Sequence, residues 1–120
     1  MDVQSMQCLL EEAKQWIKAE PTAQQVIAVK TAKGNAYHFA NRCVGEARDE
    51  ERFLQMLCEK DDKAVRYLVC MWRNGEIDVP SMYFRRRLIE ICPQNTNALV
   101  LLQGMNAFTV REIRQLMPGE

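Results

Sequence analysis

The chain has 120 residues, a length that suits one domain with a substantial hydrophobic core. Its 16 basic and 16 acidic residues balance to a formal net charge of zero. This balance argues against a general nucleic-acid binder, which normally carries an excess of basic residues on one face. No apolar run approaches the roughly 20 residues of a membrane-spanning helix, so we expect no membrane partner.

The first third of the chain predicts a helix followed by a β-hairpin. Apolar residues recur at the spacing of one helix face over residues 5–19, and Pro21 ends that helix because proline disfavours a helical conformation in the residue before it. The β-branched run 25–31 predicts a strand. A turn containing Gly34 leads into a second short strand over 36–40, and the two strands form a hairpin.

The middle of the chain alternates between helix and strand. Residues 48–59 predict a helix whose first turn is acidic, which favours the positive end of the helix dipole. Residues 65–72 are almost all apolar, which is typical of a central strand that is covered on both faces and has parallel neighbours. A second helix is expected over about 80–92 and a buried strand over 98–103.

The last segment carries the clearest helix-start signal in the sequence. Thr109 and Glu112 have the spacing of a capping box, and Phe108 with Ile113 has the spacing of a hydrophobic staple. The sequence therefore predicts a final helix after Phe108. The sequence leaves open whether a strand forms between Gln103 and Phe108.

This order of elements defines an α/β fold class. Two strand–helix–strand crossovers after a hairpin predict a three-layer α/β/α sandwich around a mixed sheet of four or five strands. The chain contains no internal repeat and no linker-like segment, so residues 1–120 are expected to form a single domain.

The five cysteines indicate a reducing compartment. Their number is odd, and no two of them form a CxxC pair. Four stand among apolar neighbours and are expected to be small buried side chains: Cys8, Cys58, Cys70 and Cys92. The polar, acidic residues 1–5 do not resemble a secretory signal, so we expect a cytoplasmic protein.

The element order, together with four short segments, resembles the cytidine deaminase family over nearly the whole chain. Residues 28–37 look like the opening hairpin of that family, and Asp49-Glu50-Glu51-Arg52 falls where it carries Cys-Ala-Glu-Arg or His-Ala-Glu. Pro80-Ser81-Met82-Tyr83-Phe84-Arg85 falls where it carries Pro-Cys-x-x-Cys-Arg. Residues 108–112 and 116–119 are similar to its closing Thr-Val-x-Glu-Leu-Leu-Pro-Gly.

The resemblance implies zinc-assisted hydrolytic deamination, but the matching positions lack the zinc ligands. In the family, one His or Cys and two further Cys hold zinc, and a glutamate that is not a ligand moves the proton. Here Glu51 matches the glutamate, Asp49 the first ligand, and Ser81 and Phe84 the two cysteines. A phenylalanine cannot bind zinc and a serine hydroxyl is a poor ligand beside a thiolate, so the sequence predicts no inherited zinc cofactor. Asp49 is a weak candidate metal ligand.

Four residues are candidates for binding a nucleoside-like ligand, two of them at the nucleoside-reading motif of the family. Asn41 matches the first residue of its Asn-x-Glu motif, whereas Cys43 stands at the glutamate position. Ser81 and Tyr83 lie at the start of the 80–92 helix, where an aromatic ring could stack on a planar base. We therefore take Asn41, Cys43, Ser81 and Tyr83 as candidate ligand-binding residues, although the loop before Asp49 is shorter than in the family.

Several of these candidates also have simpler structural explanations. Glu51 in a first helical turn can serve only to compensate the helix dipole. His38, the only histidine, is expected to be half-exposed or hydrogen-bonded, and Cys43 to be an inert residue or a reactive thiol. Arg52 and Arg85 match arginines in the two family motifs, and we expect them to bond across helix ends or a subunit boundary.

Two hypotheses of function follow. The first is a cytidine deaminase-like protein without deaminase activity, which binds a small nucleoside-like ligand or acts as an assembly module, as a homodimer or homotetramer. The alternative is a divergent hydrolase that deaminates a nucleoside or small amine, using Glu51 with Asp49, Cys43 or His38 and a non-standard metal site. A Ser81–His38–Asp49 triad is set aside because no nucleophile-elbow glycines flank the serine.

Overall fold

The computed structural model describes residues 2–103 and 109–118. Its helices are α1 (Val3–Ala19), α2 (Arg48–Glu59) and α3 (Met82–Ile91), with two short 3₁₀ helices, η1 (Pro93–Asn97) and η2 (Ile113–Leu116). Its strands are β1 (Gln25–Thr31), β2 (Ala36–Asn41), β3 (Val65–Trp72), β4 (Ile77–Asp78), β5 (Leu99–Leu102) and β6 (Thr109–Glu112). The sequence therefore predicted β1, α2 and β3 to the residue.

The six strands form one mixed sheet in the order β2-β1-β3-β5-β6, with the short β4 paired to β3. β1 runs antiparallel to both β2 and β3, β5 runs parallel to β3, and β6 runs antiparallel to β5. The expectation of parallel neighbours for the 65–72 strand is thus right on one side and wrong on the other. The two-residue β4, which the sequence did not predict, pairs with Cys70 and Met71 of β3.

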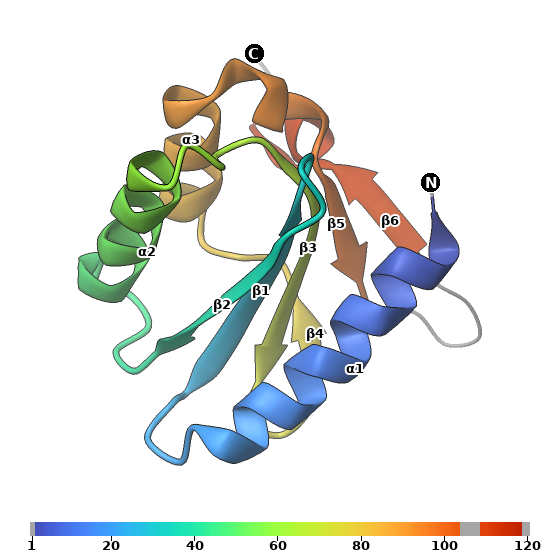
Figure 1. Ribbon diagram of the computed structural model, residues 1–120. Helices are drawn as coiled ribbons and strands as arrows, with labels where there is room; N and C mark the ends of the chain where they lie inside the picture. The colour runs from blue at the N-terminus through green and yellow to red at the C-terminus, as the bar shows by residue number, and fades with distance from the viewer. Residues whose placement is uncertain (1, 104–108, 119–120) are drawn as a thin grey trace.

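Helices cover both faces of the sheet (Figure 1). The helix α1 lies across one face and buries Met6, Leu9, Ala13 and Ile17 against β1 and β3. The helices α2 and α3 lie on the opposite face and bury Leu54, Leu57 and Leu88 among other residues. This arrangement confirms the predicted three-layer sandwich.

Local capping explains where two of the helices begin. The Asp2 carboxylate accepts hydrogen bonds from the backbone N–H groups of Gln4 and Ser5 at 3.1 and 3.3 Å, and so caps α1. The Ser81 hydroxyl accepts from the backbone N–H of Phe84 at 3.1 Å and caps α3 in the same way. Ser81 therefore has a structural role in addition to its place in the motif.

The predicted final helix is wrong. Residues 109–112 form the strand β6, which pairs with β5 in a register that sets Leu99 opposite Glu112 and Leu102 opposite Thr109. A capping box is present, but Glu112 and Gln115 form it at the start of η2. Pairing with the edge of β5 outweighed the local helix signal, because a strand edge offers a full ladder of backbone hydrogen bonds. Phe108 and the segment between Gln103 and Phe108 lie outside the described residues.

The expected burial of the cysteines is wrong for Cys8 and Cys58, which are exposed. Each cysteine lies on the outward side of its helix. Cys8 is two residues from the buried Met6, and Cys58 is next to the buried Leu57, so neither side chain points into the core. Cys70 is fully buried, as expected, and Cys92 is partly buried.

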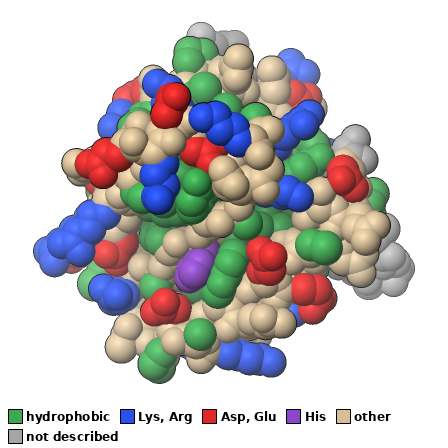
Figure 2. Space-filling model, viewed as in Figure 1, with side chains coloured by type: hydrophobic (Ala, Val, Ile, Leu, Met, Phe, Trp, Pro, Cys, Tyr) green, Lys and Arg blue, Asp and Glu red, His purple; other side chains and the backbone are tan. Residues whose placement is uncertain are grey.

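Charged side chains of both signs are interspersed over the face shown in Figure 2, without a large basic patch there. No helix within residues 2–103 and 109–118 is long and apolar enough to cross a membrane.

Candidate functional site

The first turn of α2 and the N-cap of α3 meet through a partly buried hydrogen bond. The Ser81 hydroxyl donates to the Glu50 carboxylate at 2.8 Å, and the side chain of Glu50 is only 2% exposed. Burial raises the pKa of Glu50, and the negative charge of Glu51 raises it further, while the bond from Ser81 acts in the opposite direction. Glu50 is therefore the acidic residue of this turn that faces the interior.

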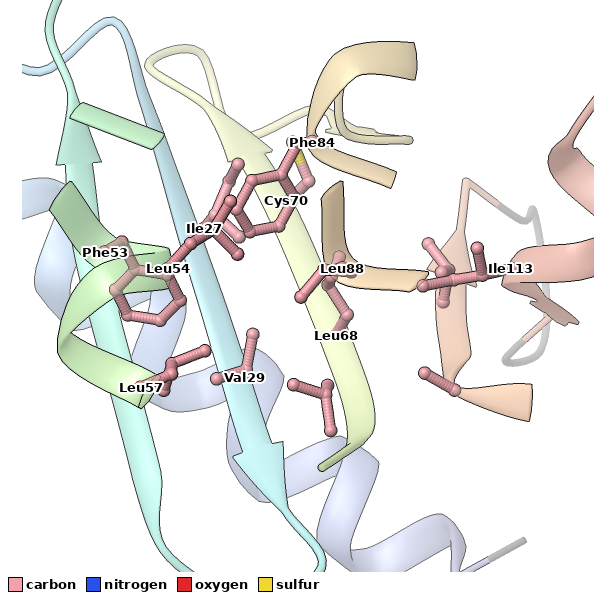
Figure 3. Close-up of a cluster of buried hydrophobic side chains, with 13 residues drawn as sticks. Ile27, Val29, Phe53, Leu54, Leu57, Leu68, Cys70, Phe84, Leu88 and Ile113 are labelled. Carbon is pink, nitrogen blue, oxygen red and sulfur yellow. The ribbon is translucent and has the colours of Figure 1, made fainter. Parts of the chain in front are cut away.

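Beside this hydrogen bond, the space is filled by aromatic rings. Phe84 is completely buried, and its ring centre lies 5.7 Å from that of Phe39 and 6.4 Å from that of Phe53. Figure 3 shows the Phe84 ring next to Cys70 and Ile27, over the face of β1 and β3. The position that the resemblance assigns to a zinc-binding cysteine thus holds a core side chain.

The residues at the zinc-ligand positions do not fit a zinc ion. Phe84 offers no donor atom, and the Ser81 hydroxyl is occupied by both Glu50 and the Phe84 backbone. Among the described residues, no group of three or more His, Cys, Asp or Glu side chains is arranged to hold a metal ion.

Glu51, the candidate proton carrier, lies in an ion pair between helices. Its carboxylate accepts hydrogen bonds from the Tyr83 hydroxyl at 2.7 Å and from Nε of Arg87 at 2.8 Å. These bonds lower the pKa of Glu51, chiefly through Arg87. A carboxylate with a lowered pKa is a weaker base, and this geometry ties α2 to α3 at the surface.

Asp49 and Cys43 meet at a different place, a small cavity of about 130 Å³ between the β2–α2 loop and the start of α2. Its walls also include Arg42, Arg48 and Arg52 together with Glu46. The Asp49 carboxylate accepts a hydrogen bond from the backbone N–H of Arg42 at 3.1 Å and so closes the loop onto the helix.

Asn41 is buried at the end of β2, with a side chain 2% exposed. Its Oδ1 finds no hydrogen-bond partner among the described residues, which is unusual for a buried polar atom. Its backbone carbonyl accepts from the N–H of Gln24 at 3.0 Å. The backbone of Asn41 therefore joins the end of β2 to the residue before β1, whereas its side-chain oxygen has no hydrogen-bond partner among the described residues.

His38 is half-buried on the α1 side of the sheet, away from the candidate residues. Its ring stacks on Trp16 with ring centres 4.0 Å apart. Burial lowers the pKa of His38, which keeps the ring neutral at physiological pH. Figure 2 shows this histidine, in purple, beside a hydrophobic side chain.

Sequence reasoning missed an open surface depression of about 750 Å³ where β3 ends. Three chain segments line it, with Ala23 and Gln24 before β1, Val44 after β2, and residues 72–74 and 76 of the β3–β4 hairpin. The backbone N–H of Val44 donates to Oε1 of Gln24 at 3.0 Å and joins two of these segments. No local motif marks these residues, because the depression exists only once three distant segments meet.

The predicted site residues therefore do not converge on one cavity. Ser81 and Phe84 join Glu50 in the interior, while Tyr83 joins Glu51 at the surface of α2 and α3. Cys43 and Asp49 line the small arginine-rich cavity, and Asn41 is buried by itself at the end of β2. Arg85 behaves as expected, since it donates hydrogen bonds to the backbone carbonyls of Pro80 and Leu116.

No protein-family model matches this sequence, and no curated protein matches it significantly. Solved structures match its fold with high probability. Cytidine deaminase from Mycobacterium leprae superposes with a TM-score of 0.69 over 94% of this chain and 97% of that chain, at 14% identity. The cytidine deaminase from Bacillus anthracis also gives a TM-score of 0.69, over 96% of this chain and 88% of its own, at 17% identity.

A third structure, cytidine deaminase from Burkholderia pseudomallei, matches with a TM-score of 0.64 over 93% of this chain and 95% of that chain, at 20% identity. The chain therefore has the cytidine deaminase fold. At these identities the likeness concerns the arrangement of the backbone, and the chemistry has to be argued from the side chains of this chain.

Proposed function

We propose that this protein is a cytidine deaminase-fold protein that does not deaminate and acts by binding. One observation carries the proposal: Phe84 is completely buried among Phe39 and Phe53 at a position where the family holds zinc through a thiolate. A metal there would need both a donor atom and space, and the aromatic ring supplies neither.

Metal analysis together with an activity assay tests the proposal. Protein purified without chelator should contain far less than one zinc per chain, and it should release no ammonia from cytidine or deoxycytidine. About one zinc ion per chain, with deamination that is lost when the zinc is removed, would overturn it.

The hydrolase alternative is favoured by one observation, the raised pKa of Glu50, because a buried carboxyl with a raised pKa is a common general acid or base. If any deamination is found, Glu50→Gln should abolish it. Replacement of Glu51 by Gln is the matched comparison, and unchanged turnover in that variant would remove Glu51 from the mechanism.

A small planar ligand is the occupant that best suits the open depression at the end of β3, because Trp72 and Val44 supply apolar surface there. The Trp72 indole is held by a hydrogen bond to Asp78 at 2.9 Å. We expect nucleosides to change the fluorescence of Trp72. A Trp16→Phe variant leaves Trp72 as the sole tryptophan, and an unchanged spectrum across a nucleoside panel would count against this ligand class.

Assembly into a homodimer or homotetramer is the second form of the proposal. The apolar faces of α2 and α3 pack on the sheet, so assembly would have to use surfaces such as the one around Tyr83, whose side chain is 44% exposed. Sedimentation at several protein concentrations tests this form, and a single monomeric species throughout would contradict it.

A further inference from the structure

A second cavity, of about 730 Å³, lies at the opposite end of the sheet from the residues discussed above. The start of α1, the end of β1, the first residues of β3 and the helix η1 form its walls. Its size falls in the range of sites for small organic ligands. It shares no lining residue with the sites around Trp72 or Cys43, so a ligand bound here would be independent of the proposed function.

Small residues leave this space open. Ala32, Gly34 and Ala64 line the cavity where the β1–β2 turn faces the start of β3. A Cβ atom at Gly34 would meet nothing within 4 Å, and the φ of +89° at this turn position favours glycine. The backbone there is fixed, since the N–H of Ala32 donates to the carbonyl of Ala64 at 2.8 Å.

The charges around the cavity favour an anion. Lys30 and Arg66 line it with a single carboxylate, Asp2. That carboxylate is already used, because it caps α1 and accepts from the Ser5 hydroxyl at 2.6 Å. Lys30 donates one hydrogen bond to the Ser5 hydroxyl at 3.3 Å and keeps two N–H groups, while Arg66 forms no ion pair with the described residues.

The neutral groups of the cavity are also able to donate. The Tyr67 hydroxyl accepts from the backbone N–H of Asp2 at 3.1 Å, so its own hydrogen is available to another acceptor. The side chains of Gln94 and Asn97 also line the cavity and form no hydrogen bond with other described residues. These neutral groups therefore add hydrogen-bond donors to the positive charges of Lys30 and Arg66.

We propose that this cavity binds a small organic phosphate, with the phosphate group between Lys30 and Arg66. A guanidinium fork matches two phosphate oxygens and an ammonium adds a compact positive charge. The hydroxyl of Tyr67 and the amides of Gln94 and Asn97 face the remainder of the ligand, which suits a polyhydroxylated body such as a sugar.

Calorimetric titration with ribose 5-phosphate, alongside ribose as the neutral probe, tests this proposal. Ribose 5-phosphate should bind saturably and more weakly as salt is added, whereas ribose should not bind measurably. Arg66→Gln should weaken the binding roughly tenfold, the loss expected for one charge-assisted contact. Arg66 is exposed, so this variant should fold normally.

Arg52→Gln is the matched control, because Arg52 is an exposed arginine that lines the small cavity beside Cys43 instead. It should leave the affinity unchanged. Lys30→Gln provides a second independent variant, with its fold checked by circular dichroism. The proposal is overturned if ribose 5-phosphate shows no saturable binding at millimolar concentrations, or if Arg52→Gln weakens binding while Arg66→Gln and Lys30→Gln do not.

Discussion

Glu50 and Glu51 are neighbours in the sequence, yet their carboxyl groups lie in opposite environments. The carboxyl of Glu50 is buried with Ser81 as its partner, and its pKa is raised. The carboxylate of Glu51 is held by Arg87 and Tyr83, and its pKa is lowered. Successive residues of an α-helix are about 100° apart, which is enough to turn one side chain inward and the next toward α3.

These two shifts predict opposite effects of pH on stability. A raised folded-state pKa means that the folded protein binds more protons, so Glu50 costs stability as pH rises above its unfolded value of about 4.3. We expect Glu50→Gln to be at least as stable as the wild type at pH 7, with its relative advantage shrinking as pH falls through the raised pKa of Glu50 and absent below about 4.3.

Glu51→Gln should behave in the opposite way. It should be less stable than the wild type at pH 7, and the difference should vanish as pH falls through the lowered pKa of Glu51. Urea unfolding of the three proteins between pH 3 and pH 8 measures both effects. Equal pH profiles for the two variants would contradict the structure.

The aromatic core at Phe84 makes a second prediction at the scale of the residue. Truncation by Phe84→Ala should lower the free energy of unfolding by about 3–5 kcal/mol, because it opens a cavity between Phe39 and Phe53. Tyr83→Ala, next to it on α3 but exposed, should cost less than about 1 kcal/mol. Similar losses in both variants, measured by urea unfolding, would show that Phe84 is not a core residue.

At the scale of the elements, the fully buried Asn95 joins three segments. Its Nδ2 donates to the carbonyls of Lys63 and Leu88 at 2.9 Å each, and its Oδ1 accepts from the N–H of Val65 at 2.7 Å. This side chain therefore holds the end of α3 against the start of β3 and fixes the position of α3 on the sheet.

Loss of this contact should be costly. Asn95→Ala leaves the buried N–H of Val65 without its acceptor and removes the donor to the Lys63 carbonyl, whereas the Leu88 carbonyl still accepts from the N–H of Cys92. We expect a loss of about 3 kcal/mol in the free energy of unfolding. Gln94→Ala, one position away and exposed, is the control and should stay within about 0.5 kcal/mol of the wild type. A loss of similar size in the control would mean that any change in η1 destabilises the protein, and that the hydrogen bonds of Asn95 are not the cause.

At the scale of the whole molecule, the cysteines report on global folding. Cys8, Cys43 and Cys58 are exposed, whereas Cys70 is buried in the central strand and burial raises the pKa of its thiol. With a thiol reagent and mass spectrometry, the three exposed cysteines should react in the native protein. Cys70 should react only at the rate of unfolding, and labelling of Cys70 as fast as that of Cys43 would contradict the buried position of β3.

The sequence by itself determined the elements whose signals are local. The β-branched run of β1, the helical spacing in α2 and the apolar run of β3 predicted their bounds, and the order of the elements predicted the sandwich. Element order together with the four short segments that resemble the family predicted the cytidine deaminase-like fold. Residue identity alone also indicated the misfit of the zinc positions, because Phe84 has no donor atom.

Only the tertiary structure decided the features that depend on distant partners. Thr109–Glu112 became a strand because the edge of β5 was available to pair with it. Glu50 rather than Glu51 faces the interior because of how α2 is rotated about its axis. That rotation is set by the packing of Phe53, Leu54 and Leu57 on the sheet, and the spacing of residues within the motif does not reveal it. The depression at the end of β3 and the cavity beside Lys30 and Arg66 likewise arise where separate segments meet.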